Sequence, residues 1–230
     1  MDILKNLRWR GLVQDVSDPK GSIELPAGTP FYVGFDPTAQ SLQVGNLVPL
    51  IVSAHLAREG LAPLILFGGA TGSIGDPSGK SEERKLLEAD VIEENIRKQM
   101  KQTTALFDRL SLNVQFVNNL DWTKDLSALH FLRDVGKYFT VNYMLAKEVV
   151  KSRIEGAGIS FTEFSYMLLQ AFDYCHLFET RGCRLQLGGS DQWGNITAGL
   201  EYIRKRKREE AYAFSFPLIT NSQGKKFGKS

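Results

Sequence analysis

Residues 32–46, YVGFDPTAQSLQVGN, decide the fold of this chain. The run from 30 to 35 is apolar and β-prone, residues 36–39 interrupt it with Asp-Pro-Thr-Ala, and apolar side chains then recur at helical spacing between 44 and 54. This pattern predicts a strand, a turn and a helix. Taken alone, it is typical of an ordinary buried βα unit, so the residue types at the turn decide whether it is more than that.

The start of the helix follows from Pro49. Proline is tolerated in the first turn of a helix, where its missing N–H is not needed, so Pro49 predicts that the helix begins near Gly45 or Asn46. Backbone N–H groups beside Gln43 and Asn46 are then expected to be free, because the first N–H groups of a helix lack intrahelical partners. An anion could bind there.

The same residues resemble a known signature. Phe-Asp-Pro-Thr-Ala at 35–39 and Ser-Leu-x-x-Gly-x-Leu at 41–47 resemble the ATP-binding signature of class I aminoacyl-tRNA synthetases, and Tyr-x-Gly at 32–34 resembles the tyrosyl enzymes. The last four positions of that signature read His-x-Gly-His in the family. In this chain they read Gln-Val-Gly-Asn, residues 43–46.

The composition is that of a globular chain without a large charge excess. Its 230 residues are 43% hydrophobic and 23% charged, with a net charge of +2, which suits one large α/β domain or two small ones. Any RNA contact must therefore be local. Two cysteines fit a reducing cytosol better than a disulfide scaffold. No apolar run approaches about 20 residues and no leader opens the chain, so we expect a soluble, cytoplasmic protein without a membrane partner.

Strands and helices alternate along the first half. An amphipathic helix is expected over 2–16, and a buried parallel strand over 62–67 follows the helix that ends near Arg58. A long helix over 82–109 and a strand over 112–117 come next. This order predicts an α/β fold of Rossmann-like type, an open, mostly parallel sheet with helices on both faces and ligands at the carboxyl ends of the strands.

An inserted helical segment is expected between the two halves of the sheet. Apolar residues recur at helical spacing between 126 and 155, and much of this surface is expected to face another subunit. In the resembled family the segment lies at a dimer interface, together with the position of Phe161. We divide the chain, as one catalytic domain over 1–230, into an N-terminal helix and loop (1–29), a first nucleotide-binding half (30–122), a helical insertion (123–160) and a second half (161–230).

A glycine-rich loop follows the strand at 62–67. Residues 68–81, GGATGSIGDPSGKS, contain glycines that let a backbone approach a ligand, and Ser81 is expected to cap the next helix. The triplet at 79–81 resembles the end of a phosphate-binding P-loop. That motif needs a glycine five residues before Gly79, where this chain has Ile74. The tyrosyl family has a similar Gly-Gly-Ala-Thr-Gly and Gly-Asp-Pro-Ser in this region.

Two further stretches point to a ligand. A helix is expected over 163–178, and polar side chains at 166, 170 and 173 fall on one of its faces, which indicates either a solvated face or a pocket. A strand over 183–187 then leads into GGSDQWGN at 188–195, a βα turn that matches the tyrosyl family closely.

The last part of the chain is basic. The run RKRKR at 204–208 favours the end of a helix through the helix dipole, and an RNA-binding patch is the alternative. A last strand is expected over 214–219. The stretch KFGKS at 226–230 corresponds to the Lys-Met-Ser-Lys-Ser loop that reaches over ATP in class I synthetases. We do not expect the C-terminal tRNA-binding modules of the family in this chain.

Carried over position by position, the resemblance implies three groups of site residues. Tyrosine would be bound by Tyr32, Gly34, Asp76, Asn119, Tyr166, Gln170, Asp173 and Gln192. ATP would contact Asp36, Gly45, Gly189, Asp191 and Lys229. The catalytic residues would be Thr38, Gln43, Asn46, Lys80, Arg84, Lys226, Lys229 and Ser230.

Within the tyrosine group, the resemblance implies two ends. Tyr32 and Asp173 would hydrogen-bond the phenol of the substrate. Its ammonium would be held by Tyr166, Asp76 and Gln170, with Asn119 behind them as support.

The remaining chemistry agrees with amino-acid activation. The chain has no nucleophile elbow, no Cys/His dyad and no His/Cys cluster at metal-ligand spacing, so we expect no metal bound by the protein itself. Activation needs none of these, because the carboxylate of the amino acid attacks the α-phosphate and Mg²⁺ arrives with ATP. The resemblance implies a tyrosine-tRNA ligase that acts on L-tyrosine, ATP and tRNA(Tyr) as a homodimer. Two alternatives remain: a synthetase-like protein that binds tyrosine or nucleotide without productive charging, and a P-loop nucleotidase.

Overall fold

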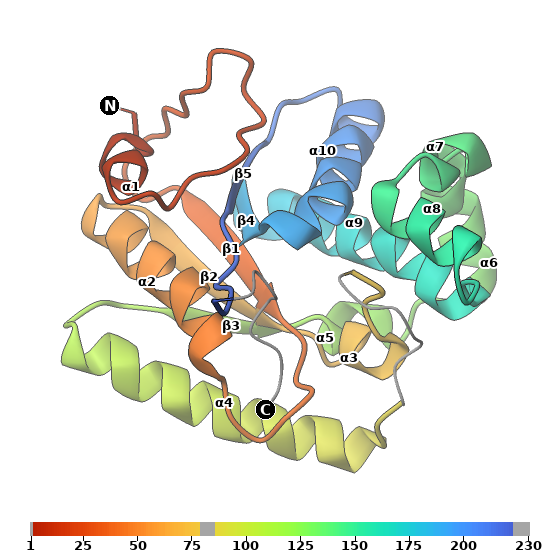
Figure 1. Ribbon diagram of the computed structural model, residues 1–230, viewed down its shortest axis with the longest axis horizontal. Coiled ribbons are helices and arrows are strands. Elements are labelled where there is room, and N and C mark those ends of the chain that lie inside the picture. Colours follow the sequence, from red (N-terminus) through yellow and green to blue (C-terminus); the bar gives the residue numbers. More distant parts are fainter. Residues whose placement is uncertain (1, 79–85, 223–230) are drawn as a thin grey trace.

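A single five-stranded sheet forms the centre of the molecule. The computed structural model describes residues 2–78 and 86–222. The sheet has the order β3-β2-β1-β4-β5, and every neighbouring pair of strands is parallel. The strands are β1 (Pro30–Phe35), β2 (Ala62–Phe67), β3 (Gln115–Asn118), β4 (Leu185–Gly189) and β5 (Tyr212–Phe216). The expected open, Rossmann-like sheet is confirmed (Figure 1).

The strand order places a switch point beside β1. The chain runs outward from β1 to β2 and β3 and then returns to β4 on the other side of β1. Tyr32 on β1 is paired with Gln186 on β4 and with Leu64 on β2. In open α/β sheets, ligands bind outside the carboxyl ends of the strands at such a point.

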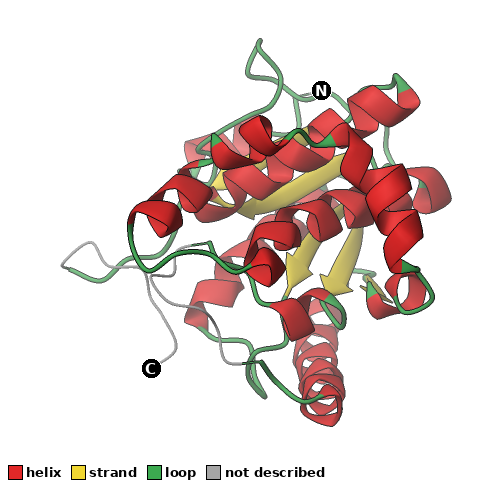
Figure 2. Cartoon of the chain, turned by 90° about the vertical axis from the view of Figure 1, so that its right-hand side faces the viewer, coloured by secondary structure: helices red, strands yellow, loops and turns green. Residues whose placement is uncertain are grey.

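Helices cover both faces of the sheet. They are α1 (Lys5–Trp9), α2 (Val44–Arg58), α3 (Thr71–Ile74), α4 (Ala89–Arg109), α5 (Leu120–Thr123), α6 (Ala128–His130), α7 (Val141–Leu145), α8 (Glu148–Glu155), α9 (Phe161–Arg181) and α10 (Trp193–Lys207), with a π-helical turn at Phe131–Val135 and 3₁₀ turns at Gly136–Tyr138 and Ser190–Gln192. The helices α2 and α4 lie on one face and α9 and α10 on the other, while α6, α7 and α8 gather beside α9 (Figures 1 and 2). The insertion expected over 123–160 is therefore helical, although its domain boundaries stay a prediction.

Successive side chains of β1 point to opposite faces of the sheet, and both faces are buried by helices. Phe31, Val33 and Phe35 enter one apolar cluster, which also contains Leu56 of α2. Tyr32 points to the opposite face and enters a second cluster with residues of α9 and α10. A strand with helices on both sides reads as a continuous apolar run, as this one does. The consequence for the site is that Tyr32 faces α9.

The expected helix over 2–16 is wrong. The helix α1 ends after five residues, and Gly11 follows in the left-handed region with φ of +69°. The next residues run along β5 instead. The backbone bonds are Gln14 N–H to Ser215 O at 2.8 Å, Ser215 N–H to Asp15 O at 2.8 Å and Ser17 N–H to Ala213 O at 2.9 Å. These bonds satisfy the open edge of the sheet, which a helix cannot do, and this explains the difference.

Several element boundaries also differ from expectation. The helix expected from 82 begins at Ala89 among the described residues. The strand expected over 112–117 is β3 and begins only at Gln115, because the N–H groups of Leu110, Ser111 and Leu112 still bond back to the end of α4. The last strand ends before Pro217, whose nitrogen has no hydrogen to give to a ladder. The strand expected over 183–187 is β4, and α9 extends the helix expected over 163–178 at both ends. The Ser160 side chain accepts the Glu163 N–H and caps α9.

Within residues 2–78 and 86–222, no helix has both the length and the apolar character needed to cross a membrane.

Candidate active site

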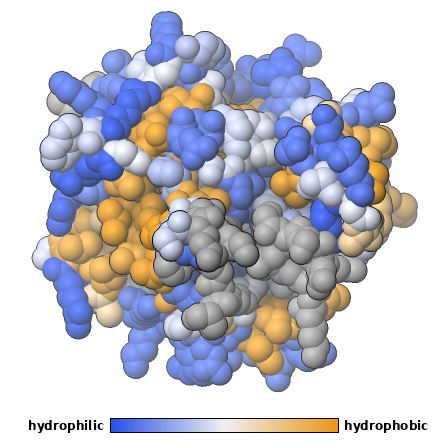
Figure 3. All heavy atoms as spheres, viewed as in Figure 1, coloured by the Kyte–Doolittle hydropathy of each residue, from blue (hydrophilic) through white to orange (hydrophobic). Residues whose placement is uncertain are grey.

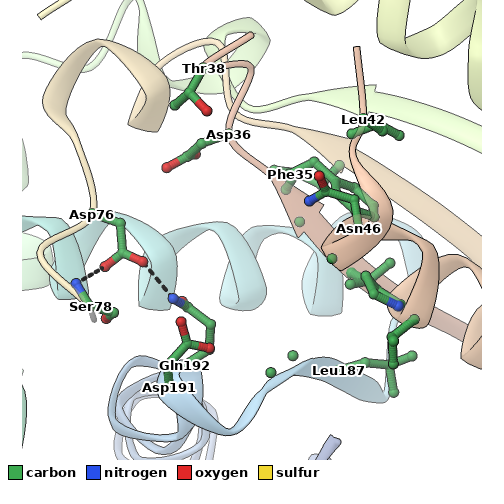
Figure 4. A pocket seen from close by; sticks show the side chains of 18 of the residues that line it. Phe35, Asp36, Thr38, Leu42, Asn46, Asp76, Ser78, Leu187, Asp191 and Gln192 are labelled. Carbon is green, nitrogen blue, oxygen red and sulfur yellow. Dashed lines mark hydrogen bonds between the residues drawn. The ribbon is translucent and has the colours of Figure 1, made fainter. Parts of the chain in front are cut away.

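A cavity of about 360 Å³ lies at the carboxyl ends of β1 and β4. Its walls come from the end of β1, the start of α2, the loop around α3, the middle of α9, the turn after β4 and residues 216–219. Figure 4 shows labelled side chains from the end of β1, the start of α2, the loop after α3 and the end and following turn of β4 around one space. The cavity therefore lies at the switch point that the sheet order predicts.

Most of the expected site residues that the structure describes line this cavity. They are Tyr32, Gly34, Asp36, Thr38, Gln43, Gly45, Asn46, Asp76, Tyr166, Gln170, Asp173, Gly189, Asp191 and Gln192. Asn119 lies behind the wall. The expected residues Lys80, Arg84, Lys226, Lys229 and Ser230, with the helix cap at Ser81, lie outside the described residues.

One end of the cavity is formed by Tyr32 and Asp173. The Asp173 carboxylate is only 3% exposed and accepts hydrogen bonds from Asn119 Nδ2 at 2.9 Å and Trp122 Nε1 at 2.8 Å. The Tyr32 hydroxyl is buried and has no hydrogen-bond partner within the described part of the chain. A buried polar group without a partner is costly, so this end of the cavity is suited to a ligand that supplies one.

Charge and burial act together on these two groups. Burial raises the pKa of Asp173 to about 7, although the hydrogen bonds from Asn119 and Trp122 lower it in part. Burial also raises the pKa of Tyr32 well above its ordinary value, and the negative charge of Asp173 adds to this effect. A neutral hydroxyl next to a carboxylate offers one donor and one acceptor to a third hydroxyl.

Asn119 has a direct bond that was not expected. Its side-chain NH₂ group donates to Asp173 Oδ2 at 2.9 Å and to Thr71 Oγ1 at 3.1 Å, and its expected support of Tyr166, Asp76 and Gln170 stays a prediction. The carbonyl oxygen of Asn119 accepts the Ala70 N–H at 2.8 Å, which turns the NH₂ group towards Asp173. The sequence places Asn119 at a strand end but does not say which neighbouring carboxylate its amide meets.

A second group of polar residues lies around Asp36, at the end of β1. Asp36 Oδ2 accepts the Tyr166 hydroxyl at 2.9 Å, and Asp36 Oδ1 accepts the Thr71 hydroxyl at 2.8 Å. A Cβ at Gly68 would lie 2.2 Å from Thr71 Oγ1 and 2.4 Å from Asp36 Oδ1. Glycine is therefore required at 68 for the two segments to meet.

A third group lies around Asp76. Its carboxylate accepts the Ser78 N–H at 3.0 Å and a hydrogen bond from the side-chain amide of Gln192 (Figure 4). The side-chain amide of Asn195 donates to it at 3.4 Å. Because Asp76 comes from the glycine-rich loop and Gln192 from the turn after β4, these bonds join two of the predicted ligand segments. Asp36 and Asp76 each add a carboxyl group to the cavity wall.

The start of α2 differs from the sequence expectation in two ways. The helix begins at Val44, so Pro49 lies inside it and not in its first turn. The N–H groups expected to be free are partly used, because Gln43 and Asn46 form a reciprocal cap in which each side chain accepts the backbone N–H of the other. The oxygens of both amides are thereby occupied, and their NH₂ groups are the ends that can donate to a ligand.

Several wall residues were not predicted as site residues. Thr71, Ser78 and Gln186 line the cavity, and Trp122 and Asn195 support its carboxylates. The sequence could have predicted Gln186 as a site residue, since it is polar and lies between two leucines in a strand expected to be buried. Its side-chain oxygen has no hydrogen-bond partner among the described residues.

The basic run at the end of α10 is largely paired. Arg204 and Lys205 contact Glu201, and Arg206 and Lys207 contact Glu179. These contacts favour a structural role at the helix end over an RNA patch. Elsewhere in the described ranges, no group of three or more His, Cys, Asp or Glu side chains is placed to hold a metal ion.

The parallel sheet and its polar cavity at the switch point define a nucleotide-binding domain of Rossmann-like type. The family model described as "tRNA synthetases class I (W and Y)" matches residues 28–230. The chain belongs to this family of class I tRNA synthetases, and the resemblance seen in its motifs is confirmed.

Individual relatives agree with the family. The chain is 51% identical over 236 residues to the tyrosine-tRNA ligase of Bacillus caldotenax, which covers 100% of this chain and 56% of that protein. It is 49% identical over 236 residues to the tyrosine-tRNA ligase of Bacteroides fragilis, again over 100% of this chain and 55% of the relative. The chain thus spans little more than half the length of these curated relatives.

A solved structure has the same fold. The C-terminally truncated mitochondrial tyrosyl-tRNA synthetase of Aspergillus nidulans is 30% identical, with a TM-score of 0.87, and the match covers 98% of this chain and 71% of that one.

Proposed function

We propose that this chain provides the catalytic site of a tyrosine-tRNA ligase, which activates L-tyrosine with ATP and transfers it to tRNA(Tyr). The observation that carries the proposal is the buried Tyr32 hydroxyl, without a partner in the described part of the chain, at the same end of the cavity as the Asp173 carboxylate. The names of the relatives support the same substrate.

The phenol of tyrosine would complete the hydrogen bonds at this end. Its hydroxyl would donate to Asp173 and accept from Tyr32, so that no polar group stays unpaired. Phenylalanine would leave the Tyr32 hydroxyl unsatisfied and would give the buried Asp173 carboxylate no donor besides Asn119 and Trp122. The specificity for tyrosine would therefore come from the cost of burying these groups without a partner.

The ammonium and carboxylate of tyrosine would lie further towards the switch point. Asp76, Tyr166 and Gln170 offer acceptors to the ammonium, and all three line the cavity. The hydrogen bonds that Asp76 accepts from Ser78 and Gln192 hold its carboxylate in one orientation. An ordered acceptor reduces the conformational entropy lost on binding.

ATP would enter from the start of α2. Gln43 and Asn46 would donate to its phosphates from the helix N-terminus, beside Thr38 and Gly45, while Asp36, Gly189 and Asp191 would contact the ribose and the carboxylate region. The tyrosine carboxylate would attack the α-phosphate, forming tyrosyl-adenylate and releasing pyrophosphate. Mg²⁺ would arrive with ATP. The proposal also assigns Lys80, Arg84, Lys226, Lys229 and Ser230 to the pyrophosphate.

The proposal includes a homodimer that assembles through the helical insertion. Large apolar side chains are exposed there and at the adjoining start of α9, among them Leu129 at 81% and Phe161 at 76%. Figure 3 shows apolar side chains on the right-hand side of the molecule, over the region of α6, α7 and α8. Large exposed apolar side chains that gather in one region of a globular protein are typical of an interface.

A reducing, cytoplasmic setting is also proposed. Cys175 and Cys183 are both buried and unbridged. Burial raises the pKa of Cys183 to about 12, which keeps its thiol neutral and inert.

Tyrosine-dependent exchange of labelled pyrophosphate into ATP tests the proposal. Exchange that requires both L-tyrosine and Mg²⁺ is expected. Tyrosine binding without exchange would indicate a synthetase-like binding protein instead, and ATP hydrolysis independent of tyrosine would indicate a nucleotidase. The Asp173→Asn variant is the matched control, because it should lose exchange with tyrosine without losing its fold.

A further inference from the structure

Thr71 connects two parts of the cavity that the proposed function treats separately. Its side chain is buried, at 3% exposed, in the first turn of α3. The hydroxyl donates to Asp36 Oδ1 at 2.8 Å and accepts from Asn119 Nδ2 at 3.1 Å. A threonine hydroxyl has a single hydrogen to donate, so these two bonds fix its direction.

The neighbours of Thr71 are themselves fixed. Asn119 accepts the Ala70 N–H through its carbonyl oxygen, so its NH₂ group is shared between Thr71 and Asp173. On the other side, the second oxygen of Asp36 accepts the Tyr166 hydroxyl. The result is one continuous series of hydrogen bonds that runs through Asp173, Asn119, Thr71, Asp36 and Tyr166.

We propose that Thr71 is a positioning residue whose hydroxyl orders Asp173 and Asp36 together, so that recognition of the phenol and the alignment of the reacting end of tyrosine depend on one side chain. This inference rests on the proposed function and deepens it. Thr71 acts through its two neighbours, and the requirement for glycine at 68 keeps the junction closed to bulkier side chains.

Two substitutions separate the hydroxyl from the shape of the side chain. Thr71→Val keeps the branched shape and removes the hydroxyl, whereas Thr71→Ser keeps the hydroxyl and removes the methyl group. Thr103→Val is the matched control, because Thr103 is equally buried and its hydroxyl bonds only to the Gln99 carbonyl oxygen of its own helix among the described residues. Each variant is titrated with L-tyrosine and with L-phenylalanine by calorimetry, and pyrophosphate exchange is measured at saturating tyrosine.

We expect Thr71→Val to weaken tyrosine binding by about tenfold or more, because two hydrogen bonds to ordered groups are lost. Phenylalanine binding should change less, so the preference for tyrosine falls. The exchange rate at saturating tyrosine should also fall, because Asp36 loses its support. Thr71→Ser should stay within about threefold of the wild type in all three measurements, and Thr103→Val should match the wild type.

A double-variant cycle tests whether Thr71 acts through Asn119. Thr71→Val should add little to the loss already caused by Asn119→Ala, since both changes break the same series of hydrogen bonds.

Three results would overturn the inference alone: unchanged tyrosine preference in Thr71→Val, equal impairment of the valine and serine variants, or additive losses in the cycle. A wild-type chain that binds no tyrosine would instead refute the proposed function, and the inference with it. If circular dichroism shows that Thr71→Val is unfolded, Thr71→Ala also lacks the hydroxyl and is judged by the same criteria.

Discussion

At Asp173, burial and hydrogen bonding have opposite effects on one carboxyl group. Burial raises its pKa from 3.8 to about 7, against the hydrogen bonds from Asn119 and Trp122, and the charge of Asp36 raises it further. The folded state therefore keeps a proton between about pH 4 and pH 7 that the unfolded chain has released. The pKa of Asp173 is higher in the folded protein than in the unfolded chain. Its protonation therefore stabilises the folded state fully below about pH 4, and this contribution to the free energy of unfolding is lost as the pH rises to about 7.

We predict that this dependence disappears in Asp173→Asn. The free energy of unfolding, measured in urea at pH 5, 6, 7 and 8, should fall with pH in the wild type relative to the variant and level off above pH 7. A difference between the two proteins that is constant with pH would show that Asp173 titrates normally.

The end of the cavity formed by Tyr32 and Asp173, where the phenol of tyrosine would bind, gives a second prediction. Tyr32→Phe removes the donor that a tyrosine substrate needs, and an unsatisfied buried group costs roughly 1–3 kcal/mol, or about 5- to 150-fold in affinity. Tyrosine binding should weaken by such a factor while phenylalanine binding stays the same or improves. Calorimetric titration measures both. Tyr138→Phe, in the helical insertion, is the control and should keep the full preference for tyrosine.

Gln43 gives a third prediction. Its side-chain oxygen is used in the cap of α2, so only its NH₂ group is available for a phosphate, and it cannot become cationic. Gln43→His should raise the rate of adenylate formation several-fold, less than the roughly 10²–10³ that loss of a whole donor costs. Tyrosine affinity should not change. Single-turnover kinetics measure the step, and a slower rate would mean that the amide suits this site better than an imidazole.

The positions of single site residues follow only in part from the sequence. Tyr32, Asp76, Tyr166 and Asp173 line one cavity. Helix periodicity predicted that Tyr166 and Asp173 share a face, and the resemblance to the family added Tyr32 and Asp76; the roles of all four stay predictions. The direct bond from Asn119 to Asp173 was not predicted. A hydrogen bond between residues 54 positions apart depends on side-chain rotamers, and no spacing in the sequence encodes those.

Among the elements, the join between α8 and α9 depends on a buried ion pair. Arg153 and Glu163 are joined by two hydrogen bonds, at 3.0 and 2.6 Å, and both side chains are almost completely buried. Removing one partner leaves the other charge buried without compensation, which costs about 3–5 kcal/mol. Since α9 carries Tyr166 and Asp173, this pair also sets the start of the helix that forms the site.

We predict that Glu163→Gln lowers the free energy of unfolding by about 3–5 kcal/mol, measured by urea denaturation. The double variant Arg153→Met, Glu163→Leu should recover most of the loss, because no charge is left buried. Glu94→Gln, in the exposed pair with Arg97, should have little effect and serves as the control. A double variant as unstable as the single one would argue that the pair itself stabilises the fold.

Elements were predicted best where one segment decides its own structure. The apolar stripe and serine cap of α9 are local, and so the helix was expected within a few residues of its observed bounds. Residues 2–16 have a helical apolar pattern too, but their backbone pairs with β5, about 200 positions later in the chain. That partner outweighs local propensity, and only the folded chain reveals it.

At the scale of the whole molecule, the helical insertion is expected to hold two copies together. We predict that Phe161→Asp with Leu129→Glu converts a dimer into a monomer, because both side chains are exposed and apolar in a single copy. Sedimentation velocity measures the mass. Trp9→Glu is the control, since Trp9 is also 81% exposed but lies on α1, outside the insertion. A wild-type chain that sediments as a monomer at micromolar concentration would contradict the prediction.

The pairing of residues 14–17 with β5 has a consequence for synthesis on the ribosome. The first of these segments leaves the ribosome early, and its partner emerges only after about 200 further residues have been made. Until then the backbone groups of the early segment have only water or non-native partners. During translation of this chain there is therefore a long period in which β1, β2 and β3 have been made but the strand that pairs with residues 14–17 has not, and this pairing waits for β5.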